Sequence, residues 1–375
     1  MPVTIGVLKE TVRGENRVAV VPEVAAKLAG AGARVLVERG AGAAARFPDA
    51  LYKDASLADG PDAVLASADL LFAVQPPEAG LVAKLKPGAV VAGFLAPHNQ
   101  QALVRALRDR KLTGFAMELV PRISRAQSMD ALSSQAAVAG YKAVLIGSAT
   151  LDKFFPMLTT AAGTIRPATV LVIGAGVAGL QAIATAKRLG AVVEAYDVRG
   201  ATREQVRSLG AKFVETGVTA EGAGGYAREL TAEEKAKQQE VLDARIAAAD
   251  CVITTAGVPG RPAPRIISRA AVERMKPGAV IVDLLAEGGG NCELSRAGET
   301  VEHQGVRVVG PVNLPASVAY HASEMYAKNL LNFIKPALKD GALAIDWNDE
   351  VFAAACVTHD GVIRHEPTRK LVESA

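Results

Sequence analysis

The stretch Gly174-Ala175-Gly176-Val177-Ala178-Gly179 decides the fold of this chain. It follows the apolar run 168–173, which has the composition of a buried strand, and it precedes a segment with helical periodicity. Between a strand and a helix, a Gly-x-Gly-x-x-Gly string is typical of the phosphate-binding turn of a Rossmann domain. Gly174 would permit the tight turn, Gly176 would let a pyrophosphate approach the backbone, and Gly179 would let helix and strand pack closely.

An acidic residue follows the next predicted strand, 192–196, at the position that contacts the adenosine ribose in Rossmann domains. The carboxylate of Asp197 could accept hydrogen bonds from both ribose hydroxyls, whereas a 2′-phosphate would meet it at close range. Arg199 could offset that repulsion only in part, or could be an ordinary solvated arginine. The pattern therefore favours NAD(H) over NADP(H), with Val177 contributing a backbone contact.

Two series of strand-like and helix-like segments surround this turn and predict an α/β fold. The strand-like runs are 3–8, 34–38, 69–74, 89–95 and 113–117, and then 170–173, 192–196, 212–215, 251–255, 279–284 and 307–309. We expect two Rossmann-like, doubly wound parallel sheets, joined by long helices over 134–155 and 316–338, with a cleft between the domains. The predicted domains are 1–133 plus 335–375, and 134–334.

A short repeat supports two related halves. Lys86-Pro87-Gly88-Ala89-Val90-Val91 returns as Lys276-Pro277-Gly278-Ala279-Val280-Ile281, in each case as a turn that leads into a buried strand.

Composition excludes several other classes of protein. A formal net charge of +3 over 375 residues is too small for a nucleic-acid-binding surface. The chain has no leader-like start and no apolar run long enough to span a bilayer, so we expect a soluble, cytoplasmic chain. Its 3 cysteines are far apart, which predicts neither a disulfide framework nor a zinc site.

The polar segment 118–130 comes after the last strand of the first series. It is rich in hydrogen-bonding side chains and poor in apolar ones, which suits a loop that holds the nicotinamide and its ribose. An ordinary polar linker explains the composition equally well.

The run 121–135, PRISRAQSMDALSSQ, resembles the NAD(H)-binding component, domain I, of proton-translocating nicotinamide nucleotide transhydrogenase. The resemblance extends along essentially the whole chain and includes Glu15-Asn16-Arg17-Val18-Ala19, Asp197-Val198-Arg199 and Gly224-Gly225-Tyr226-Ala227. It implies a transhydrogenase of the Si-specific/Re-specific type that is active only with its partner subunits.

The resemblance also implies roles for individual residues. Gln127 would be the catalytic residue, because it would reach toward the partner's nucleotide. The nicotinamide and its ribose would be held by Arg122, Gln127, Asp130 and Ser133, and Ile123, Ser124 and Arg125 would also bind the cofactor. The pyrophosphate and the adenosine ribose would be held by Val177, Asp197, Val198 and Arg199, and a mobile loop with Gly225 and Tyr226 would close over bound NAD(H).

The partners that the resemblance implies are an NADP(H)-binding domain and a membrane proton-channel subunit of the same complex. A hydride would pass directly between the two nicotinamides, coupled to proton movement, and such a transfer needs positioning rather than an acid and a base. The resemblance further implies a homodimer, peripheral to the plasma membrane through its partner subunits.

Two other functions stay open at this point. The chain is also similar to alanine dehydrogenase, which shares the setting of Arg17, but Gln75 stands where that family has a substrate-binding lysine. His98 lies near the place of that family's catalytic histidine, and an ordinary loop histidine is the alternative. The third hypothesis is a catalytically silent NAD sensor.

Overall fold

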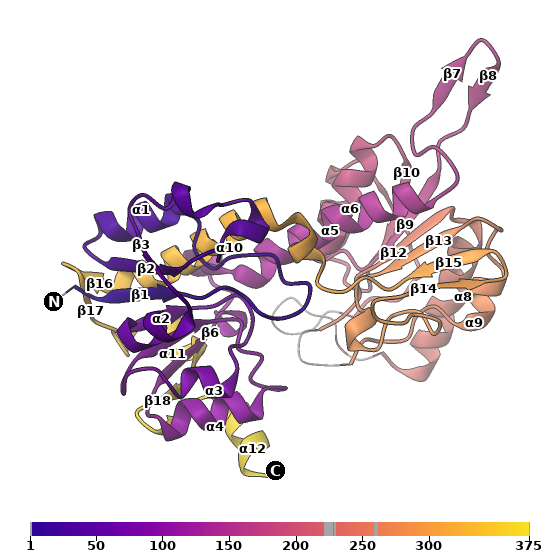
Figure 1. The fold of residues 1–375 in the computed structure, drawn as a ribbon. Helices are drawn as coiled ribbons and strands as arrows, with labels where there is room; N and C mark the ends of the chain where they lie inside the picture. The colour runs from indigo at the N-terminus through magenta and orange to yellow at the C-terminus, as the bar shows by residue number, and fades with distance from the viewer. Residues whose placement is uncertain (1, 221–227, 229, 259–261, 375) are drawn as a thin grey trace. The chain divides into compact units, whose positions relative to one another are not determined.

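The computed structural model describes residues 2–220, 228, 230–258 and 262–374. It divides the chain into two compact units, 1–135 with 315–375, and 136–314 (Figure 1). The chain therefore returns to the first unit at residue 315 rather than at residue 335. The reason is helix α10 (Ala319–Ile334), which buries Tyr326, Leu330 and Phe333 in the core of the first unit.

The first unit contains an 8-stranded sheet with the order β19-β18-β6-β5-β4-β1-β2-β3. Strands β6 to β3 are parallel, and β18 joins antiparallel to β6. The strands are β1 (Thr4–Val7), β2 (Arg34–Glu38), β3 (Ser56–Ala58), β4 (Leu70–Phe72), β5 (Val90–Gly93), β6 (Thr113–Ala116), β18 (Cys356–His359) and β19 (Val362–Ile363). A separate pair, β16 (Leu338–Lys339) and β17 (Ala342–Leu343), lies outside this sheet.

Helices cover the sheet of the first unit because each presents an apolar stripe to it. Helix α1 (Pro22–Gly30) begins with its proline in the first turn and buries Val24, Ala25 and Leu28. The others are α2 (Pro61–Ser67), α3 (Ala79–Val82), α4 (Gln101–Asp109), α11 (Glu350–Ala355) and α12 (Glu366–Glu373), together with α10.

The second unit contains a 7-stranded sheet with the order β11-β10-β9-β12-β13-β15-β14, parallel except for β14. The strands are β9 (Thr169–Ile173), β10 (Val192–Tyr196), β11 (Lys212–Phe213), β12 (Cys251–Thr254), β13 (Val280–Asp283), β14 (Thr300–His303) and β15 (Val306–Val309). The helices are α6 (Val177–Arg188), α7 (Thr202–Ser208), α8 (Ala232–Ala248) and α9 (Arg269–Glu273). Helix α5 (Ala131–Thr150) carries the chain into this unit.

A two-stranded hairpin, β7 (Leu158–Thr160) and β8 (Gly163–Ile165), projects from the second unit (Figure 1). Every residue of its two strands is exposed.

The two units share one topology of parallel strands. Their parallel strands follow the same order, with β3-β2-β1-β4-β5-β6 matching β11-β10-β9-β12-β13-β15. At the amino edge of each sheet, one aspartate accepts the amide of the first strand and pairs with the lysine of the repeated Lys-Pro-Gly turn. In the first unit Asp69 makes these contacts with Thr4 and Lys86, and in the second unit Asp250 makes them with Thr169 and Lys276. The repeat in the sequence is therefore a repeat in structure.

Every predicted strand is present, and the predicted α/β class with two doubly wound parallel sheets is confirmed. The strands that the sequence pattern did not predict include β3 and β14, at sheet edges, and the antiparallel pair β18 and β19, which extends the first sheet beyond β6. None of the helices in the described part of the chain has the length and apolar composition needed to cross a bilayer.

Candidate functional site

The glycine-rich turn joins β9 to α6, as predicted, and packing requires two of its glycines. Gly174 has a φ of +95°, and a Cβ there would lie 2.9 Å from both the amide nitrogen of Ala256 and Oγ1 of Thr255. A Cβ on Gly179 would lie 1.8 Å from the carbonyl oxygen of Gly174. Neither position therefore accepts a side chain.

Gly176 differs from these two glycines. Its φ of −78° is open to any residue, and among the described residues a Cβ there would meet only Nη2 of Arg199, at 3.9 Å. Neither backbone conformation nor packing against the described residues explains a glycine at this position. Because Gly176 caps α6, whose first N–H groups lack acceptors within the helix, the open space is where an anion could approach the backbone. Val177 begins the helix and is exposed.

Asp197 lies directly after β10, is buried, and holds the turn. Its Oδ2 accepts the amide of Ala175 at 2.7 Å, and its Oδ1 accepts the amide of Arg199 at 2.9 Å. Nε and Nη2 of Arg199 also donate to the two carboxylate oxygens, at 2.8 and 2.7 Å. The ion pair places the guanidinium beside Gly176. The residue between Asp197 and Arg199 in the sequence, Val198, accepts the amide of Ala220 with its carbonyl oxygen at 2.8 Å.

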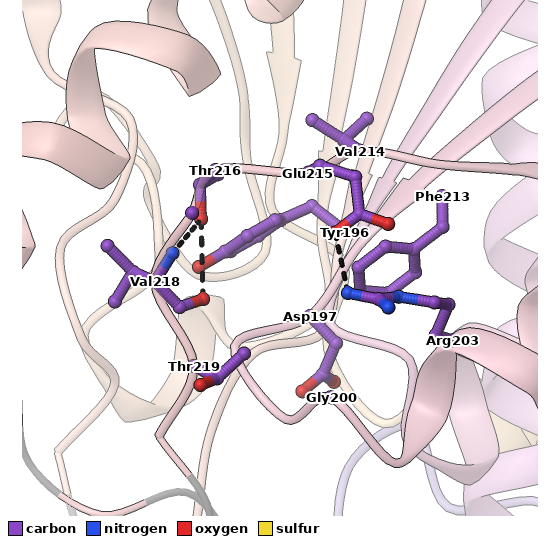
Figure 2. Close-up of a pocket in the computed structure, with 11 residues that line it drawn as sticks. Tyr196, Asp197, Gly200, Arg203, Phe213, Val214, Glu215, Thr216, Val218 and Thr219 are labelled. Atoms are coloured by element: carbon purple, nitrogen blue, oxygen red, sulfur yellow. Dashed lines mark hydrogen bonds and ion pairs between the residues drawn. The ribbon is translucent and has the colours of Figure 1, made fainter.

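A cavity of about 190 Å³ opens beyond the carboxyl ends of β10 and β11 (Figure 2). Tyr196 and Thr216 form part of its wall, and Asp197 lies at its edge. Arg203 pairs with Glu215 at 2.7 Å across the cavity lining. Burial raises the pKa of Tyr196 to about 12, so its hydroxyl keeps its proton at neutral pH. No sequence pattern predicts this cavity, because it is formed by segments that meet only in the folded sheet.

The polar segment 118–130 folds as short 3₁₀ turns, including η4 (Ser124–Met129), rather than as an extended linker. Ala126 and Met129 are buried in the core of the first unit, and Ile123 packs against that core. The side chains of Arg122, Ser124 and Gln127 are exposed. The segment therefore has an anchored side and an outward side.

Three other predicted site residues, two in this segment and one in the first turn of α5, have partners within the first unit. Arg125 forms two hydrogen bonds with the carboxylate of Asp349, at 3.1 and 2.5 Å. Asp130 accepts the amide and the hydroxyl of Ser133, at 2.8 and 2.6 Å, and so caps the start of α5. Gly225 and Tyr226 lie outside the described residues.

Two glutamates for which the sequence predicted no role of their own accept backbone amides of loops at the carboxyl edge of the first sheet. Glu10 accepts the amides of Val74 and Gln75, at 2.6 and 3.3 Å. Glu118 accepts the amides of Leu95 and Ala96, at 3.0 and 2.5 Å. Burial raises the pKa of each carboxyl group to about 7. No motif marks them, because both are single acids whose burial depends on the fold.

This burial predicts a pH dependence of stability. The pKa of Glu118 lies above its ordinary value of 4.5, so the native state binds more protons than the unfolded chain up to about pH 7. The free energy of unfolding should fall as pH rises through this range, and Glu118→Gln should reduce the total fall between about pH 4.5 and pH 7 by about 1 kcal/mol or more. Urea unfolding at several pH values measures it. A slope that is unchanged in the variant would contradict the assignment, and Glu78→Gln, at a site on another loop, is the control.

Arg17 and Gln75 lie together at this same edge, bound to one acid. Nε and Nη2 of Arg17 donate to the carboxylate of Glu15, at 2.8 and 2.7 Å, and Nη1 donates to Gln135 at 2.9 Å. Gln75 donates to Glu15 at 2.7 Å. His98 is exposed, with its ring 6.0 Å from that of His365. Among the residues described, no three His, Cys, Asp or Glu side chains gather as they would around a metal ion.

Comparison with known proteins accounts for both halves of the chain. The N-terminal domain of alanine dehydrogenase/PNT matches residues 6–139, and the C-terminal domain of the same family matches residues 143–366. The chain belongs to the alanine dehydrogenase/PNT family. The resemblance predicted from the sequence is thereby confirmed.

Within this family the chain is similar both to subunits of NAD(P) transhydrogenase and to alanine dehydrogenases. It is 50% identical over 374 residues to the first portion of NAD(P) transhydrogenase subunit alpha of Rhodospirillum rubrum, covering 96% of this chain and 97% of that protein. It is 30% identical over 378 residues to alanine dehydrogenase of Mycobacterium tuberculosis, covering 96% and 95%. The solved structure of transhydrogenase from Sinorhizobium meliloti superposes with a TM-score of 0.88 at 45% identity, covering 96% of this chain and 99% of that one.

Proposed function

We propose that this chain is the NAD(H)-binding subunit of a proton-translocating transhydrogenase. A hydride would pass directly between NAD(H) on this chain and NADP(H) on a partner domain, coupled to proton translocation through a membrane subunit. The observation that carries the proposal is the open backbone at Gly176, in a chain whose relatives at 50% and 44% identity are both named for the first portion of NAD(P) transhydrogenase subunit alpha.

The residues present fit a dinucleotide. The open turn and the start of α6 suit the pyrophosphate, with the guanidinium of Arg199 beside it. Asp197 suits the adenosine ribose, and the cavity next to it suits the adjoining base. The residues assigned to the nicotinamide are those of the polar segment, where Gln127 and Arg122 present exposed side chains. Bound nucleotide would supply the hydride, and the residues of this chain would hold the nicotinamide in position for the transfer.

Alanine dehydrogenase remains the alternative, and two contacts argue against it. An amino-acid dehydrogenase needs a cation for the substrate carboxylate beside the nicotinamide. Arg17 already donates through all three guanidinium nitrogens, and the neutral Gln75 donates to Glu15. Membership of the family alone does not separate the two activities, because the family includes both names.

One pair of assays separates the candidate functions. The purified chain is mixed with NADH and the NADP(H)-binding domain of a transhydrogenase, and reduction of NADP⁺ is followed; in parallel, NADH oxidation is followed with pyruvate and ammonia. We expect turnover only in the first assay. Turnover with pyruvate and ammonia alone would establish the dehydrogenase instead, and tight NADH binding without turnover in either assay would leave the silent sensor.

The ribose assignment predicts unequal effects at Asp197 and Arg199. Asp197→Ala should weaken NADH binding by about tenfold or more, because it removes the acceptor for the ribose and for the amide of Ala175. Arg199→Ala should weaken it much less, since the carboxylate it releases can still accept the ribose hydroxyls. Fluorescence titration with NADH measures both, and equal losses would refute the assignment.

The hairpin supports the proposed homodimer. Leu158 pairs with Ile165 on one face, and Thr159 pairs with Thr164 on the other. An isolated two-stranded hairpin is marginally stable in water, so an exposed apolar face suits burial against a second copy. Ile165→Asp should convert dimer to monomer in analytical ultracentrifugation, while Thr164→Asp should not. A dimer that survives Ile165→Asp would place the interface elsewhere.

A further inference from the structure

We propose that Asn329 of α10 is a positioning residue: it fixes Gln127 by holding the backbone carbonyl group of the next residue, Ser128. This inference rests on the proposed function and deepens it. Asn329 lies on the buried face of α10, 7% exposed, in line with the apolar residues Tyr326, Leu330 and Phe333. A polar side chain on such a face costs free energy unless its hydrogen bonds are made.

Both ends of the Asn329 amide have partners. Nδ2 donates to the carbonyl oxygen of Ser128 at 2.9 Å, and Oδ1 accepts the hydroxyl of Ser134 at 2.7 Å. One turn later on the same helix, Nδ2 of Asn332 donates to the same Ser128 carbonyl at 3.2 Å. Two asparagines three positions apart therefore converge on one backbone atom of the polar segment.

The held carbonyl lies at the outward corner of the segment. The residues on either side of the corner, Ala126 and Met129, are buried, while Gln127 and Ser128 have exposed side chains. The carbonyl oxygen of Gln127 accepts only a long bond, from the amide of Asp130 at 3.4 Å. Without the bonds to Ser128, the backbone between the two buried residues would be held less firmly, and the orientation of Gln127 with it. Hydride transfer depends on position to a fraction of an ångström, so this bond would act on rate rather than on nucleotide affinity.

The test uses a matched pair of variants around the same amide. Asn329→Asp removes the donor to Ser128 and keeps the acceptor for Ser134. Ser134→Ala removes the bond at the other end and keeps the donor. We expect Asn329→Asp to lower the rate of hydride transfer with the partner domain about tenfold, with the Kd for NADH unchanged within about twofold, and Ser134→Ala to leave both within about twofold.

A second measurement needs neither nucleotide nor partner. Amide hydrogen exchange over residues 122–130 should be faster in Asn329→Asp than in the unsubstituted chain or in Ser134→Ala. If Asn329→Asp does not fold, Asn332→Ala replaces it, with a smaller rise in exchange and a smaller fall in rate expected.

Three outcomes would overturn the inference: unchanged exchange and rate in the Asn variants, equal losses in Ser134→Ala, or a loss of NADH affinity parallel to the loss of rate. Failure of the proposed function is a different result, because the unsubstituted chain would then show no hydride transfer while the exchange comparison still reports on the anchor.

Discussion

Gly176→Ala should abolish most of the affinity for NADH while leaving the protein folded. Among the described residues, the added Cβ would have only Nη2 of Arg199 within 4 Å, but it would occupy the side from which we propose that a pyrophosphate approaches the backbone. We expect a loss of at least about tenfold in affinity, and a free energy of unfolding within about 0.5 kcal/mol of the original.

Gly179→Ala is the matched control, and its main effect should be on stability rather than directly on the contact with NADH. Its Cβ would lie 1.8 Å from the carbonyl oxygen of Gly174, so α6 and β9 would have to separate. Overpacking against the backbone should lower the free energy of unfolding by about 3 kcal/mol or more. NADH titration and urea unfolding on both variants measure the contrast. An undiminished affinity in Gly176→Ala would show that no pyrophosphate approaches this turn.

Gln127→Ala should slow hydride transfer strongly and spare nucleotide binding. The Gln127 side chain is exposed and makes no hydrogen bond to another described residue, so its removal should not change stability. If Gln127 sets the distance to the partner's nucleotide, its loss should lower the transfer rate about 100-fold, a size typical of mispositioned reactants. The Kd for NADH should stay within about threefold.

Ser128→Ala is the control for Gln127→Ala, because it alters the neighbouring exposed side chain and keeps the anchored carbonyl. Stopped-flow transfer to a partner domain loaded with an NADP⁺ analogue measures the rate directly. Equal rates in Gln127→Ala and the unsubstituted chain would remove Gln127 from the reaction.

The central strands of both sheets could be predicted because they are buried on both faces and appear in the sequence as continuous apolar runs. Edge strands such as β14 carry exposed polar residues, and nothing local distinguishes them from loops. The place of α10 could not be predicted either, since its amphipathic pattern shows that it packs but not on which core. Its buried Tyr326 and Asn329 donate hydrogen bonds to Ala73 and Ser128, which are 253 and 201 residues earlier in the sequence, so these contacts depend on the folded structure.

The candidate site was predictable to the same degree. The glycine turn and Asp197 follow from spacing, because Rossmann geometry fixes them relative to one strand each. The pairing of Asp197 with Arg199 did not follow, since it depends on a side-chain rotamer. The capping of α5 by Asp130 depends on where the helix begins, which sequence patterns locate only to within a few residues.

The return of the chain to the first unit at residue 315 sets an order of folding during synthesis. The second unit is continuous, so all of its strands have left the ribosome once residue 314 has emerged. The first unit begins earlier and finishes later, because β6 must wait for its neighbour β18, with Gly114 pairing to Thr358, and its core must wait for α10. The middle of the chain can therefore be native while the segment made first is still incomplete, and premature termination near the C-terminus would damage the N-terminal sheet.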